Sequence, residues 1–463
     1  MPFTFHAFAA DINTQRVVEQ VSGYDWLQLS KPELVDLSRT VLSMPDIPYH
    51  SREVIHRINS LGMEWDIAAN VYEPEDLAMI PVGPDGKKSG ILLLHGGSGD
   101  HRGLDRFARL LSAKFGFKVV NMSYPGRYYL QDPGRDWPGD TIYPDGTVRT
   151  PVWKQDEIIT PDQYEVVQDR EESRRRRWGT LTLACAREGT NFYNRMAGWP
   201  VAHEEGSREL VRRYLPENEY SVYIHGHSTG GPMGMMLTQR IDNIAGFLGM
   251  ESSPFGALYG KMTREIQGIS DPWEMGFNCL RIRSWQDIAR YYGYELIQAE
   301  GVEALSRLAM VMEEVHENWE QVTSQPNFKA ENILHFDSPD ELAAAGRATA
   351  KRLGLDQEMT EALVDRYLGY LRETSGSGTK PVPPLLLIIT KNSRDHSPEI
   401  YRQVYLPGYA DMDPAPKLTL YQFDAGIHGY NAAEEDLPAG VAPAGAKLWY
   451  DAIMDGYFLQ QDE

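Results

Sequence analysis

The sequence has little cysteine and no long apolar run, which limits the disulfides, thiolate metal clusters and membrane spans that it could form. It contains two cysteines, Cys185 and Cys279, in 463 residues, which predicts neither a disulfide framework nor a thiolate metal cluster. No apolar run approaches the roughly 18 residues that span a bilayer. The first residues lack the basic stretch and apolar core of a signal peptide. We therefore expect a cytoplasmic protein that does not enter a membrane.

Positive charge is also scarce, with 45 Lys and Arg against 66 Asp and Glu and a net charge of −21. This balance disfavours binding to nucleic acid or to an anionic membrane surface. No His, Asp and Glu group has metal-ligand spacing and no glycine pattern matches a dinucleotide site, so we expect no metal and no cofactor. The one basic run, 174–177, follows acidic residues. We interpret it as a solvated helix face with internal ion pairs, an anion-recognising patch being the alternative.

The most informative motif is the stretch Gly226–Gly230, which reads G-H-S-T-G. It follows the β-branched and aromatic run 221–225 and precedes an apolar stretch with helical character. A G-x-S-x-G pattern between a strand and a helix is typical of a sharp turn that exposes a nucleophilic serine, here Ser228. The outer glycines are expected because a Cβ would clash where the strand and helix backbones approach.

Apolar strand patterns alternate with helical patterns along much of the chain. This alternation predicts an α/β fold with a mostly parallel, doubly wound sheet. The turn at 83–89 is expected to be a hairpin connection into the next strand. Strands are expected at 64–72, 90–94, 118–123, 221–225, 244–250, 384–390 and 417–423, and helices around 104–111 and 447–457.

At 463 residues the chain is long for one core, and we divide it into a core with additions. Ser30 and Glu33 form a capping-box pattern, so residues 1–60 are expected to be an N-terminal helical extension. The core comprises 61–253 and 381–463, with an insertion at about 128–170. Residues 254–380 are expected to form a helical cap between the sixth and seventh core strands.

Ser228 needs a base and an orienting acid to act as a nucleophile. In serine hydrolases with such a turn the base comes last in the chain, after the final strand. His428 lies there, in a glycine-flanked loop. Asp395, after the preceding strand, is the favoured acid, with Glu251 at the end of the strand 244–250 as the alternative.

An oxyanion hole is expected from backbone amides near the serine. One would belong to Thr229, and the other to Gly97 or Ser98 in the glycine-rich loop after the strand 90–94. Residues that could line a substrate pocket are His227, Trp273, Phe277 and Tyr128.

With the histidine and glycines at 95–97, the G-H-S-T-G motif, Asp395 and His428, the sequence resembles the α/β-hydrolase superfamily. The resemblance covers roughly 65–127, 221–254 and 384 to the C-terminus. It implies a serine hydrolase that cleaves a carboxylic ester or a lactone through an acyl-enzyme. Amide or peptide cleavage, carbon–carbon bond hydrolysis and acyl transfer remain alternatives, as does a small-molecule-binding protein without turnover. The expected partner is a small molecule with an apolar or aromatic part, and a homodimer is left open.

Overall fold

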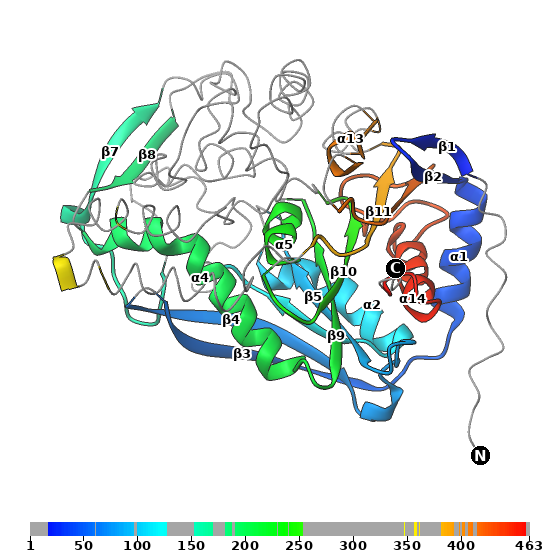
Figure 1. The fold of residues 1–463 in the computed structure, drawn as a ribbon, viewed down its shortest axis with the longest axis horizontal. Helices are drawn as coiled ribbons and strands as arrows, with labels where there is room; N and C mark the ends of the chain where they lie inside the picture. The colour runs from blue at the N-terminus through cyan, green and yellow to red at the C-terminus, as the bar shows by residue number, and fades with distance from the viewer. Residues whose placement is uncertain are drawn as a thin grey trace.

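The computed structural model describes residues 17–60, 62–96, 100–126, 152–169, 181–187, 190–228, 230–238, 240–252, 381–392, 401–402, 406–410 and 414–459, with a few isolated positions between them (Figure 1). Twelve strands lie in this part of the chain. They are β1 Val17–Val21, β2 Tyr24–Leu29, β3 Tyr49–Ser60, β4 Met63–Pro74, β5 Lys88–Leu94, β6 Lys118–Met122, β7 Tyr164–Asp169, β8 Leu181–Ala186, β9 Tyr220–Gly226, β10 Ile244–Met250, β11 Leu385–Thr390 and β12 Leu418–Phe423.

Ten of these strands form one sheet in the order β1-β2-β12-β11-β10-β9-β5-β6-β4-β3. The run from β2 to β6 is parallel throughout, and β1, β4 and β3 pair antiparallel at the edges. The strands β9, β10 and β11 are buried along their whole length or nearly so, as expected of parallel strands covered on both faces. The predicted mostly parallel sheet is confirmed.

Helices cover both faces of the sheet. The described α-helices are α1 Lys31–Ser43, α2 Asp105–Phe115, α4 Asn191–Tyr214, α5 Gly230–Thr238, α13 Leu406–Ala410 and α14 Ala442–Met454, with short 3-10 turns at Leu77–Met79, His101–Leu104 and Pro161–Gln163. Gly234 of α5 packs against Ile224 and Phe247. The neighbouring strand residues Tyr223 and Leu248 belong instead to the core beneath α1, α2 and α14. Side chains alternate along a strand, so α5 and these three helices lie on opposite faces.

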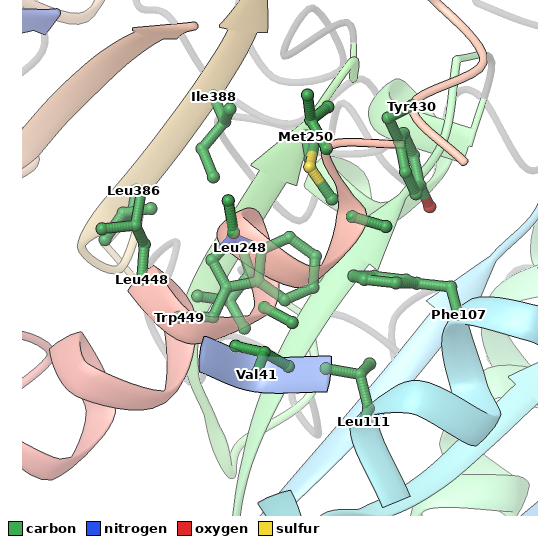
Figure 2. Packing of buried hydrophobic residues seen from close by; sticks show 14 of the residues in the cluster. Val41, Phe107, Leu111, Leu248, Met250, Leu386, Ile388, Tyr430, Leu448 and Trp449 are labelled. Atoms are coloured by element: carbon green, nitrogen blue, oxygen red, sulfur yellow. The ribbon is translucent and has the colours of Figure 1, made fainter. Parts of the chain in front are cut away.

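A described hydrophobic core lies between the sheet and the helices α1, α2 and α14. Figure 2 shows Trp449 of α14 at its centre, with Val41 of α1, Phe107 of α2 and strand residues such as Leu248 around it. Phe107 meets the Trp449 ring edge-to-face at a centroid distance of 5.2 Å. This packing joins helices from both ends of the chain into one layer behind the sheet.

The N-terminal part differs from the predicted helical extension. The predicted helix is present as α1, and the Ser30 amide donates to the Glu33 carboxylate at 2.8 Å, as in a capping box. However, α1 is flanked by strands that join the main sheet, β2 beside β12 and β3 beside β4. The alternating pattern of 54–60, half-exposed on one side, is the strand signal that the helical interpretation overlooked.

The end of the predicted insertion contributes β7, the first strand of a hairpin, and the chain after it contributes the second strand, β8, and the long helix α4. The strands β7 and β8 pair antiparallel, and α4 then crosses the sheet. Arg195 of α4 pairs with Glu157 at 2.7 Å and lies 4.6 Å from the Trp65 ring centre, which fastens the segment before β7 to β4. The cap at 254–380 and the run 174–177 lie outside the described residues, apart from isolated cap positions.

Most other predicted elements are found close to their expected bounds. The turn at 83–89 is a hairpin connection closed by an antiparallel bridge between Val82 and Lys88. The last helix begins earlier than expected, at Ala442, because Pro443 suits a first helical turn and Gly440 ends the preceding loop at a positive φ. None of the described helices is long and apolar enough to cross a bilayer.

Candidate active site

The serine of the G-x-S-x-G motif occupies a strained turn. The strand β9 ends at Gly226 and α5 begins at Gly230. Ser228 between them has φ 54°, a left-handed conformation that costs a non-glycine residue energy. The amides of Gly230 and Gly231 donate to the carbonyls of His227 and Ser228 at 2.8 Å each, so the helix starts directly on the turn. This is the geometry predicted for a nucleophile elbow.

The two outer glycines are required by close backbone contacts. A Cβ on Gly226 would lie 1.7 Å from the Gly230 carbonyl oxygen, and one on Gly230 would lie 2.5 Å from that of Leu94. No larger residue fits at either position without moving backbone. The predicted reason for these glycines is therefore confirmed.

A buried glutamate, Glu251, is hydrogen-bonded to the serine turn through its backbone. Glu251 directly follows β10, is fully buried and has φ 53°. Its carbonyl accepts from the Ser228 amide at 3.0 Å. The carboxylate accepts from the Thr390 amide at 2.6 Å through Oε1, and its Oε2 lies 3.2 Å from His428 Nδ1. Glu251 thus links the serine turn to the histidine loop.

The loop that carries His428 is fixed at several points. The Gly426 amide donates to Glu434 Oε1 at 2.9 Å, and Lys31 of α1 donates to Oε2 of the same carboxylate at 3.2 Å. The amide of Val441 donates to the Tyr430 carbonyl at 2.9 Å. The hydrogen bond with Glu434 raises the pKa of Lys31. These contacts hold the loop against the end of the sheet.

His227 contacts the same loop. Its Nε2 lies 2.9 Å from the His428 carbonyl oxygen, which can only accept, so Nε2 carries a proton. The two imidazole rings stack at a centroid distance of 4.8 Å and an angle of 29°. Burial and the neighbouring His428 lower the pKa of His227 to about 3. His227 Nε2 therefore donates its hydrogen bond to the backbone of the His428 loop.

A second histidine, His225, is fully buried and makes hydrogen bonds beside the ends of β9 and β10. His225 Nδ1 donates to the Leu248 carbonyl at 2.8 Å, and Tyr430 Oη lies 3.1 Å from its Nε2. Burial lowers the pKa of His225 to about 3, so this imidazole is neutral. Ser252 adds a hydroxyl that donates to the Gly226 carbonyl, and its own carbonyl accepts from Tyr401 at 2.9 Å. These polar contacts brace the ends of β9 and β10.

Several predicted site residues lie outside the described part of the chain: Asp395, Thr229, Gly97, Ser98, Tyr128, Trp273 and Phe277. The loop before Gly97 is described as far as Gly96. A Cβ on Gly96 would lie 3.3 Å from Ser228 Cβ, so the backbone of this loop packs directly on the serine turn. In the described ranges, no group of three or more His, Cys, Asp or Glu side chains could hold a metal ion.

The strands that carry the site lie within four adjacent positions of the sheet, with β11 between β10 and β12. Ser228, Glu251 and His428 follow β9, β10 and β12, and ligand sites of open parallel sheets lie at such carboxyl ends. Their order along the chain, serine, carboxylate, histidine, is that of hydrolases with a nucleophile elbow. This mostly parallel α/β sheet, with the three groups at its carboxyl ends, agrees with the fold that the sequence resemblance implies.

Comparisons with known proteins add little to this geometry. No family model matches the chain, and no curated protein matches its sequence. Among solved structures, a bacterial heroin esterase is 12% identical over 91% of this chain and 96% of its own, with a TM-score of 0.36. A carboxyl esterase from the fungus Tuber melanosporum is 9% identical over 89% and 87%, with a TM-score of 0.37. Similarities this distant say nothing about the substrate.

Two supporting contacts of the site were not anticipated from the sequence. Tyr430 and Ser252 both contact His225 or the strand end beside it. Tyr430 lies two residues after His428, and Ser252 directly follows Glu251, so nearness to candidate residues was the available signal. The hydrogen-bond partners of Tyr430 and Ser252 depend on the order of the strands in the sheet, and no local sequence pattern reveals that order.

Proposed function

We propose that this protein is a serine hydrolase that cleaves a carboxylic ester or a lactone. The observation that carries the proposal is the convergence of three groups: Ser228 on a left-handed turn, Glu251 hydrogen-bonded to its amide, and His428 within 3.2 Å of the Glu251 carboxylate. A serine hydroxyl is inert at neutral pH without an adjacent base. A buried carboxylate beside imidazole Nδ1 keeps the proton there and leaves Nε2 free to act as that base.

The proposed reaction has two steps. His428 Nε2 takes the Ser228 proton as Oγ attacks the carbonyl carbon, and the imidazolium then protonates the leaving alkoxide as the ester bond breaks. Water next attacks the acyl-enzyme, His428 accepts its proton and returns it to Ser228 Oγ, and the carboxylic acid leaves. The oxyanion of each tetrahedral intermediate would be held by the amides of Thr229 and of Gly97 or Ser98.

Glu251 is the proposed orienting acid. It is the carboxylate that lies beside His428 Nδ1 among the described residues, and the Thr390 amide fixes its other oxygen. Asp395, favoured from the sequence, remains the alternative. An acid at the end of β10 must reach past β11, and the glutamate side chain has the extra methylene that this span requires.

The substrate class follows from the acyl chemistry and from the expected lining of the pocket. We propose a small molecule with an apolar or aromatic part, bound beside Tyr128, Trp273 and Phe277. The same three groups serve amide cleavage, carbon–carbon bond hydrolysis and acyl transfer. A binding protein without turnover would have no use for a serine on a strained turn joined to a carboxylate–imidazole pair.

Hydrolysis of short-chain aryl esters by the wild type and by Ser228→Ala tests the proposal. We expect a loss of about 10⁴-fold in kcat in the variant and no labelling by a fluorophosphonate probe. Ser112→Ala is the matched control, because it removes a buried hydroxyl from α2 that takes part in none of the site contacts described above. Undiminished turnover in Ser228→Ala, or a wild type that the probe does not label, would exclude the mechanism.

A further inference from the structure

We propose that His227 is a positioning residue, which holds the His428 ring in register with Ser228 and supports its positive charge during turnover. The inference rests on the proposed function of Ser228 and His428, and it goes beyond it by assigning a role to the residue that precedes the nucleophile.

Two contacts join His227 to His428. The first is the hydrogen bond from His227 Nε2 to the His428 carbonyl, 2.9 Å long. The second is the stacking of the two rings, at 4.8 Å between centroids and 29° between planes. One contact fixes the backbone of the base and the other fixes its ring, so rotation of the imidazole away from Ser228 would break the stacking.

His227 also touches the other loop of the site. A Cβ on Gly96 would lie 3.2 Å from His227 Nδ1, which places the glycine loop directly against this ring. The edge of the ring meets Tyr430 at 5.2 Å between centroids. His227 therefore lies between the loop expected to supply the oxyanion hole and the loop that supplies the base.

The charge state of His227 suits this position. Its low pKa, caused by burial and by His428, keeps the ring neutral at working pH. The other groups near the two rings are the Glu251 carboxylate, the neutral His225 and the Tyr430 phenol, whose pKa burial raises well above its usual value. When His428 takes the serine proton, its imidazolium thus faces an uncharged aromatic ring, an arrangement that favours the cation.

Two substitutions separate the hydrogen bond from the stacking. His227→Gln keeps an amide donor near the Nε2 position but has no ring. His227→Phe keeps a flat ring but has no donor. His50→Gln, on the half-exposed edge strand β3, is the control for replacing a histidine elsewhere.

We expect His227→Phe to lower kcat by about tenfold with KM within twofold, because one hydrogen bond to the base is lost. We expect His227→Gln to move the acidic limb of the pH profile of kcat/KM down by about 0.5 pH units, because the imidazolium loses its aromatic neighbour. His50→Gln should change neither quantity. Fluorophosphonate labelling and the thermal midpoint are recorded for every variant.

The outcomes distinguish this inference from the proposed function. If the fluorophosphonate probe does not label Ser228 in the wild type, both the proposed hydrolase function and the role of His227 are excluded. A labelled wild type with His227 variants that keep its kcat and its pH profile overturns the role of His227 alone. Equal losses of kcat in both variants with an unmoved acidic limb also overturn it, because a purely structural residue would behave in that way.

Discussion

Replacing Glu251 by Gln tests the assignment of the orienting acid most directly. The substitution keeps the size of a fully buried side chain and removes its charge. The two partners of the carboxylate are the Thr390 amide at 2.6 Å and His428 Nδ1 at 3.2 Å. A backbone amide can only donate, so the one carbonyl oxygen of Gln must face Thr390. Its NH₂ group then faces His428.

This geometry gives the expected magnitude. An NH₂ group beside Nδ1 favours the tautomer in which Nδ1 accepts and Nε2 carries the proton, and that tautomer cannot take a proton from Ser228. In a serine protease triad the equivalent change lowers kcat about 10⁴-fold, which corresponds to about 5 kcal/mol of activation free energy. We expect a loss of about 10³- to 10⁴-fold here, with KM little changed.

The assay is the initial rate of aryl ester hydrolysis at saturating substrate, with Asp395→Asn and Asp424→Asn measured in parallel. Asp424 is close to His428 in sequence, but its Oδ1 accepts from Gln28 Nε2 at 2.7 Å, so its substitution should leave kcat within about threefold. The reasoning is refuted if Glu251→Gln retains more than about a tenth of wild-type kcat while Asp395→Asn loses activity.

Three further changes should act through backbone contact, a buried ion pair and proton linkage. Gly226→Ala should abolish soluble expression or activity because of the 1.7 Å overlap, whereas Gly103→Ala, with nothing within 4 Å, should retain both. Arg195→Gln should lower the free energy of unfolding in urea by roughly 3 kcal/mol, because the Glu157 carboxylate would lose its cationic partner and keep the Asn191 amide donor; an unchanged midpoint would contradict this. The pKa of His225 is lowered to about 3, so the unfolded chain binds the extra proton and stability falls as the pH drops below about 6.5. In His225→Gln, urea unfolding between pH 6 and pH 5 should show a slope smaller by about 1.4 kcal/mol per pH unit, and an identical slope would refute the linkage.

The core strands could be predicted from the sequence because each is a short apolar run bounded by turn residues. The run before Gly226 and the run 385–390 are examples, and the structure has them as β9 and β11. The serine turn was predictable for the same local reason: two glycines flank Ser228 at a fixed spacing.

What could not be predicted depends on neighbours in space. The segment 24–29 becomes a strand by pairing with β12, almost 400 positions away. Which carboxylate lies beside His428 depends on how far a side chain at the end of β10 extends past β11. No local pattern distinguishes Glu251 from Asp395 in that respect, because both follow buried strands.

The pairing of β2 with β12 has a consequence for how the protein is made. Trp26 Nε1 donates to Gln422 Oε1 at 3.2 Å across 396 positions, and Lys31 reaches the Glu434 carboxylate in the loop that carries His428. Domains fold from the N-terminus during synthesis, but β2 must wait for a partner strand that is synthesised almost 400 residues later. The serine turn is likewise synthesised before His428, so under the proposed mechanism the nascent chain gains its base only after β12 has been made and joins the sheet.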